Sequence, residues 1–312
     1  MLNFRKTRSE PGWLAIAKGV GRVDLVHVRR EVDRLPQVLL AESIASGGDE
    51  GNVVATLATL KKSLHLGRYR LTALLAAGQY QFIQTDAIAG PPDEAREIAR
   101  WKLKDQAGFA VDGAAIDLLP IPPLGRAPQV YAVLAAESVM MPLVQSFQAA
   151  KLALAAVDVV ELSQRNLAAL FEEEDRALAT LVFDEAEGLL TFTFAGELLV
   201  ARHIEISAAQ LAAADTLRRE QLFERIALDV QRSLDNFDRS FSMVQLARLV
   251  VAGIPGVAGF IEYLQDNLAV EVVPLNLAAV IDLGAAPALL DPQRQFQCLR
   301  ALGAALREEP VA

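Results

Sequence analysis

The strongest constraint on the fold of this chain is a pattern that occurs twice: three apolar, strand-like segments in hairpin succession, followed by a stretch with helical spacing. The pattern begins at Trp13 and again at Ala177. The six strand-like segments are 13–17, 23–28, 37–44, 177–183, 189–194 and 198–206. Helical spacing follows over 50–66 and near 207–241. Because short glycine-containing turns between apolar runs indicate hairpins, the repetition predicts a duplicated α/β architecture.

A different pattern interrupts the first copy at Gly90, where two prolines and an aspartate mark the start of a helix. Two short strand-like segments, 114–119 and 130–135, and a helix over 138–150 follow. This alternation predicts a β/α insert within the first half. The predicted units are a first subdomain of residues 1–90 and 151–175, an inserted β/α subdomain of residues 91–150, and a second subdomain of residues 176–312.

The long helix predicted near 207–241 carries one apolar stripe. Its members are three or four residues apart, which is the spacing of a single helical face. They are Phe223, Ile226, Val230, Leu234, Phe237 and Phe241. Charged residues occupy the other faces, so we predict a helix packed on a sheet rather than a membrane or coiled-coil helix.

Composition narrows the functional classes. Thirty basic and 39 acidic residues give a net charge of −9, which disfavours binding to nucleic acids and to anionic lipids. The single cysteine, Cys298, cannot form an internal disulfide and is expected to be a packed thiol. No apolar signal region follows the basic start, and no apolar stretch approaches ~18 residues, so we expect a soluble cytoplasmic protein.

Most catalytic signatures are missing from the sequence. His27, His65 and His203 lie on separate predicted elements without the spacing of metal ligands, so no metal site is expected. No G-x-S-x-G motif joins a strand to a helix, and no catalytic residue is assigned.

Several stretches resemble, in matching order along nearly the whole chain, the PilM family of actin-like proteins of type IV pilus assembly. The resemblance is strongest to its MshI-like members, which serve the mannose-sensitive haemagglutinin pilus. The matching stretches are 98–105, 109–112, 155–159, 167–170, 228–237 and 299–307. No single motif is specific, so the resemblance rests on the common order of these stretches along the chain. The resemblance implies an actin-like ATPase (ribonuclease H-like) fold with an inserted subdomain in the first half.

The resemblance also implies a nucleotide site, whose parts can be checked against this sequence. Actin-like proteins hold ATP phosphates between two glycine-rich hairpin turns, and an aspartate orients the hydrated metal. In the first turn Lys18, Gly19 and Gly21 remain, and they also suit a plain hairpin. The preceding Asp-Ile-Gly of the family is replaced by alanines at Ala15 and Ala17 around an isoleucine.

The second and third turns also depart from the family pattern. Asp184 and Gly188 frame the second turn, but acidic side chains, Glu185 and Glu187, replace small residues and would repel a triphosphate. In the adenosine-contacting turn Gly253 and Gly256 remain of a run of consecutive glycines. We therefore expect a pseudo-ATPase without a resident cofactor, with at most weak binding of ATP and Mg²⁺.

By the same resemblance, the partner is the cytoplasmic N-terminal tail of a PilN-like inner-membrane protein, and the pilus assembly motor ATPase is a second candidate. The implied groove lies near the insert and includes Trp101, Phe109 and Val111, although Trp101 also suits a core position. The expected function is a non-catalytic cytoplasmic adaptor, peripheral to the inner membrane through its partner. The alternatives are an active actin-like ATPase or sugar-kinase-like enzyme, and the cytoplasmic domain of a type II secretion platform protein.

Overall fold

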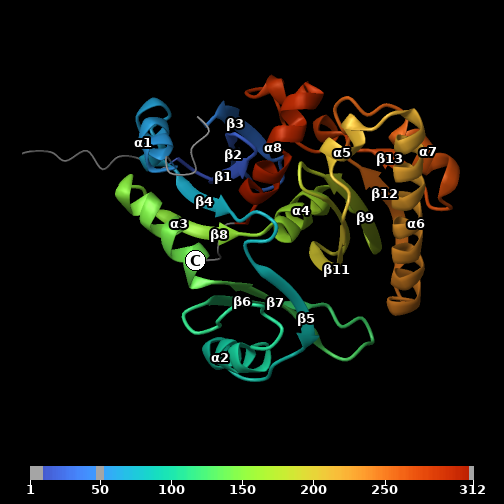
Figure 1. Ribbon diagram of the computed structural model, residues 1–312, viewed down its shortest axis with the longest axis horizontal. Coiled ribbons are helices and arrows are strands. Elements are labelled where there is room, and N and C mark those ends of the chain that lie inside the picture. Colours follow the sequence, from blue (N-terminus) through green and yellow to red (C-terminus); the bar gives the residue numbers. More distant parts are fainter. Residues whose placement is uncertain (1–9, 47–52, 309–312) are drawn as a thin grey trace, which may run out of the picture.

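Strand pairing sorts the strands into three sheets in the computed structural model, which describes residues 10–46 and 53–308 (Figure 1). Two of these sheets have five strands each, and the third has three. The start of the helix predicted over 50–66 and the N-terminal residues 1–9 lie outside the described residues. Among the residues that are described, no helix has the length and apolar character needed to cross a bilayer.

The first sheet has the strand order β3-β2-β1-β4-β8. Its strands are β1 Trp13–Gly19, β2 Arg22–Arg29, β3 Gln37–Ala45, β4 Arg70–Leu74 and β8 Leu154–Asp158. The first three strands pair antiparallel, and β4 and β8 join parallel to β1. The helices around this sheet are α1 Val53–Ser63, α3 Glu137–Ala149 and α8 Pro292–Ala305. Helix α4, Val160–Ala168, packs beside α8 and contacts the first three strands of the second sheet, which is described below. Although α8 is distant in sequence, it packs on β1 and β2, so we count it with the first half.

The second sheet has the order β11-β10-β9-β12-β13, which repeats the first strand for strand. Its strands are β9 Arg176–Phe183, β10 Gly188–Phe194, β11 Glu197–Ile204, β12 Gln245–Val251 and β13 Val272–Pro274. Again the first three strands pair antiparallel, and the last two are parallel to the first. The equal order and directions confirm the predicted duplication.

The helix predicted near 207–241 is two helices, α5 Ala208–Ala213 and α6 Thr216–Ser240. The Ser207 side chain accepts a hydrogen bond from the Gln210 backbone and starts α5, while Asp215 accepts from the Arg218 backbone and starts α6. These two N-caps explain the break, which apolar spacing does not reveal. The predicted apolar stripe faces the core, since Ile226 and Val230 are fully buried. Beyond α6 the chain forms α7, Phe260–Asn267, beside β13.

The third sheet, in the order β5-β7-β6, is separate from the other two. Its strands are β5 Gln81–Asp86, β6 Ala115–Ile121 and β7 Gln129–Ala135, and α2 Pro92–Lys102 packs against it. Strand β5, which we placed in the first subdomain, belongs to this sheet, where Phe82 stacks on Tyr131 at 4.5 Å. Helix α3, which we placed in the insert, packs beside α1, with Phe147 in the core of the first sheet.

The insert also contacts the second half. The Tyr131 hydroxyl donates a hydrogen bond to the Leu199 carbonyl at 3.2 Å, and the Arg126 guanidinium lies 4.7 Å from the centre of the Phe241 ring. Ile121 joins Tyr131 in the apolar core of the second half. The three-stranded sheet therefore contacts the second half through these groups, and Figure 1 shows it below the two larger sheets.

The buried stripe of α6 gives a first prediction. Replacing Ile226 or Val230 by Asp places a charge without a partner in the core, so each variant should lose about 3–5 kcal/mol of unfolding free energy. Arg225→Ala, on the exposed face of the same helix, should change little. Denaturant unfolding checks this, and Asp variants as stable as the parent would show that the stripe is not buried.

Candidate functional site

The turn between β1 and β2 and the turn between β9 and β10 face one another and are joined by an ion pair. Arg22 Nη1 lies 2.5 Å from Glu185 Oε1. The same guanidinium contacts Asp24, with Nε 3.1 Å from each carboxylate oxygen. Asp24 is buried on β2, and burial raises the pKa of its carboxyl, an effect that Arg22 opposes. Arg22 thus holds a buried carboxylate of the first half and a carboxylate of the second half together.

The glycines of the first turn fit this arrangement. A Cβ at Gly19 would lie 2.5 Å from the carbon of the Arg22 guanidinium, so the absence of a side chain leaves room for the arginine. Gly21 has φ +65°, a backbone conformation that glycine adopts without strain. Lys18, the remaining candidate in this turn, is exposed.

In the second turn the polar groups are engaged within the protein. Asp184 Oδ1 accepts hydrogen bonds from the backbone N–H groups of Ala186 and Glu187, at 2.8 and 3.0 Å, which closes the turn. Its other oxygen, Oδ2, lies 3.4 Å from Arg300 Nη2 of α8. Gly188 is buried where a Cβ would meet the Phe183 ring at 2.5 Å. Asp184 and Gly188 are therefore explained by turn closure and by packing.

The other predicted nucleotide positions lie on β1 and in the loop after β12. Ala15 and Ala17 are buried in the apolar core that includes α8, so a methyl group at Ala15 occupies the position where the resemblance implied a metal-orienting carboxylate, and Ala17 stands in place of the glycine. Gly253 and Gly256 are exposed between β12 and α7, and Gly256 has φ +76°. Within residues 10–46 and 53–308, no group of three His, Cys, Asp or Glu side chains is placed to hold a metal ion.

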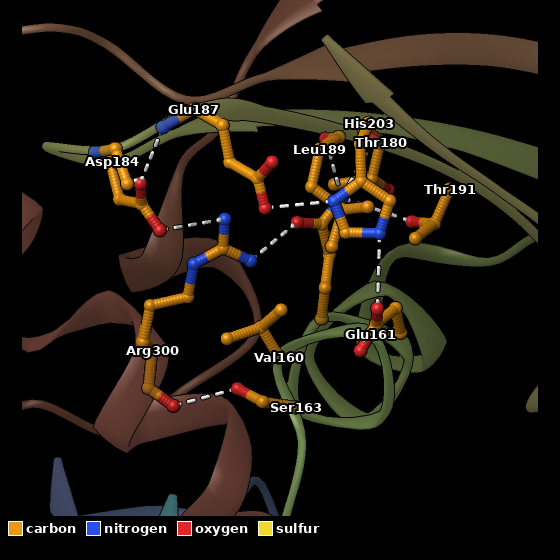
Figure 2. Close-up of polar contacts among 12 residues, drawn as sticks. Val160, Glu161, Ser163, Thr180, Asp184, Glu187, Leu189, Thr191, His203 and Arg300 are labelled. Carbon is orange, nitrogen blue, oxygen red and sulfur yellow. Dashed lines mark hydrogen bonds and ion pairs between the residues drawn. The ribbon is translucent and has the colours of Figure 1, made fainter. Parts of the chain in front are cut away.

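A polar cluster that the sequence analysis missed lies beside the second turn (Figure 2). His203 of β11 places Nδ1 2.8 Å from Glu187 Oε1 and Nε2 3.0 Å from Glu161 Oε1. Glu161, in the first turn of α4, is 1% exposed, and its Oε2 accepts a 2.5 Å hydrogen bond from the Tyr80 hydroxyl. The histidine therefore joins a carboxylate of α4, which packs on the second sheet, to a carboxylate of the second turn.

The chemistry of this cluster follows from its partners. Both ring nitrogens of His203 face carboxylates, and these hydrogen bonds raise its pKa to about 10, so the ring is cationic at neutral pH. Burial and the Glu161 carboxylate raise the pKa of Tyr80 far above its usual value. A cationic imidazole has no free lone pair to accept a proton, so His203 is not a general base at neutral pH.

Gln164 extends these contacts toward α8. Its Nε2 lies 2.8 Å from the Thr180 carbonyl of β9 and 3.0 Å from Thr191 Oγ1 of β10, while its Oε1 accepts from Arg300 Nη1 at 3.0 Å. The Arg300 carbonyl accepts from Ser163 Oγ at 2.6 Å. Figure 2 shows α4, α8 and the second sheet meeting through these groups. The partners come from distant parts of the chain, so sequence spacing carried no signal for them.

The residues proposed to bind a partner fall into different environments. Trp101, on α2, is 68% exposed, and Ile98, one turn earlier on the same helix, is 47% exposed. Phe109 is partly buried against the small core beneath α2, and Val111 is 3% exposed within that core. The side chain of Val111 is therefore not presented at the surface. Trp101 is therefore a surface residue and not a core residue.

The cationic His203 gives a pH prediction. Its pKa is about 10 when folded and about 6.5 when unfolded, so the stabilisation it supplies is complete below pH 6.5 and is lost as the pH rises through 10. Since the ring is about one third exposed, solvent screening reduces the effect to on the order of 1–2 kcal/mol. His203→Gln should lack this slope in unfolding free energy. An imidazole NMR titration with a midpoint below pH 7 would contradict the assignment.

Comparison with known proteins identifies the fold of this chain. No protein-family model and no curated protein sequence matches the chain. A solved structure titled as a PilM-PilN type IV pilus biogenesis complex contains a similar chain, with 18% identity and a TM-score of 0.73, covering 95% of this chain and 98% of that one. A Bacteroides thetaiotaomicron protein with an actin-like ATPase fold and unknown function aligns at 12% identity and a TM-score of 0.51, over 93% of this chain and 99% of that one. The duplicated sheets and these likenesses show that the chain has the actin-like ATPase fold.

Proposed function

We propose that this protein is a non-catalytic, cytoplasmic adaptor of a type IV pilus assembly platform of the mannose-sensitive haemagglutinin type. The observation that carries the proposal is the likeness to a chain of the PilM-PilN complex, which extends over almost the full length of both chains. The sequence stretches that resemble MshI-like proteins support the finer assignment.

The contacts between the two turns support a non-catalytic role. Arg22 and Glu185 meet where the resemblance implies a phosphate clamp, and Glu187 is held by His203. A triphosphate entering between the turns would have to separate these pairs and lie near two carboxylates. At ~4 Å each like-charge contact costs about 1 kcal/mol in water and several times more when desolvated. Without a carboxylate at Ala15, β1 lacks the metal-orienting side chain that the resemblance implies.

The proposed partner is the cytoplasmic N-terminal tail of a PilN-like inner-membrane protein, and the adaptor would connect it to the assembly motor. Trp101 and Ile98 give the insert an exposed apolar surface, and buried aromatic anchors supply much of the binding energy in protein complexes. Strands β5 and β6 are the edges of the three-stranded sheet, and an extended tail can add to such an edge through backbone hydrogen bonds. Protein contact of this kind would keep the adaptor at the membrane.

The first test of the proposal is nucleotide binding. We expect calorimetry with Mg-ATP to show no binding tighter than about 1 mM, which corresponds to about −4 kcal/mol, because the turns are joined by their own ion pair. Micromolar binding would favour the alternative of an active actin-like ATPase or kinase-like enzyme.

The second test is partner binding. A peptide with the sequence of the PilN-like tail should bind with micromolar affinity, since an ordered tail loses backbone entropy. Trp101→Ala should weaken binding at least about tenfold, or ~1.4 kcal/mol. Leu217→Ala, which removes an equally exposed apolar side chain from α6, is the matched control. Fluorescence anisotropy measures both, and equal affinities for the two variants would place the site away from Trp101.

A further inference from the structure

Charged side chains connect the two halves at the second turn. Arg22 of β2 pairs with Glu185, and Arg300 of α8, which packs on β1 and β2, pairs with Asp184. Two further pairs, Glu161 with His203 and Arg165 with Glu197, join α4 to β11, which α4 already contacts. The two pairs at the second turn therefore cross the boundary that separates the halves.

We propose that Arg22–Glu185 and Arg300–Asp184 form a built-in latch that holds the two halves in one relative position without a bound ligand. The inference goes beyond the proposed function, because it concerns the relative motion of the halves and not the partner. An adaptor could bind its partner whether or not the latch holds.

The burial of the latch residues favours a specific tether over an incidental surface contact. The side chains of Arg22 and Arg300 are 14% and 11% exposed, whereas isolated surface pairs contribute little because water competes for both charges. Arg22 is also fixed from its own side by the buried Asp24, so little rotamer freedom remains to be lost when it meets Glu185. Both latch pairs end on adjacent residues of the second turn, Asp184 and Glu185.

The insert adds a second attachment on another part of the boundary. It is continuous with the first half, yet Tyr131 hydrogen bonds to Leu199, and Ile121 lies in the core of the second half. Rotation of the second half away from the first would separate these contacts together with the latch. The closed arrangement is thus supported at two places.

Glu185 is the cleanest point at which to test the latch, because Arg22 keeps its contact with Asp24 when Glu185 is changed. Glu185→Arg sets two guanidinium groups against each other without leaving a buried charge unpaired. The matched control is Glu31→Arg, which reverses a carboxylate that pairs with Arg29 and Arg34 within the first half.

The distance between the halves is measured by pulsed electron resonance between spin labels at Lys62→Cys on α1 and Arg232→Cys on α6, which are both exposed. The native Cys298 is buried, and burial raises the pKa of its thiol to about 12, so it should not take up label. We expect one narrow distance distribution for the ligand-free parent and for Glu31→Arg. Glu185→Arg should broaden the distribution about twofold or add a longer distance.

A distribution for Glu185→Arg that coincides with the parent would overturn the latch. Should that variant not fold, Glu185→Gln combined with Asp184→Asn removes both pairs without adding charge, while the Asn Oδ1 can still accept the hydrogen bonds that close the turn. The same two outcomes apply to it. Binding of the tail peptide, measured on the same samples, tests the proposed function separately, so loss of one property identifies which proposal fails.

Discussion

The burial of Asp24 is the constraint on which the contact between the halves depends. A carboxylate on an inner strand loses its hydration, and the nearby Arg22 guanidinium offsets part of that cost. Arg22 is thereby held beside Gly19, where a Cβ would crowd its guanidinium, and its Nη1 reaches Glu185 of the second turn. Glu185 can then complete the set of partners. The need to pair the buried Asp24 within the first sheet thus places the Arg22 guanidinium between the two turns.

The close packing of α8 on α4 is the second condition for this site. A Cβ at Gly303 would lie 2.1 Å from the Ser163 carbonyl oxygen, so only glycine permits this approach. The approach brings Arg300 to Asp184 and to Gln164, and it brings Arg307 within 2.7 Å of the buried Asp158. The end of the chain therefore supplies two cations to carboxylates that lie far away in sequence. Unpaired, the buried carboxylate of Asp158 would be strongly destabilising.

Sequence periodicity predicted the elements whose pattern is local. The hairpins that start at Trp13 and Ala177 and the apolar face of α6 were predicted correctly, because alternation and helical spacing are visible within one element. The place of β5 in the third sheet was missed, because it depends on pairing with the distant strand β7. The break at Asp215 was also missed, because an N-cap there starts a new helix within a stretch predicted as one helix. The cluster around His203 joins α4 to β11, and no local signal marks such contacts.

The acidic residues of the second turn have two consequences that come from the same side chains. Carboxylates at Glu185 and Glu187 replace the small residues of the family pattern. Under the proposed function, this replacement removes a binding site for phosphate. In the structure each of them faces a cation of its own, Arg22 or His203. The negative charge that a nucleotide would bring between the turns is thus already present as protein carboxylates. A phosphate would compete with Glu185 and Glu187 for Arg22 and His203. The two glutamates belong to the same chain as these cations, so they lose less entropy on pairing than a free phosphate does.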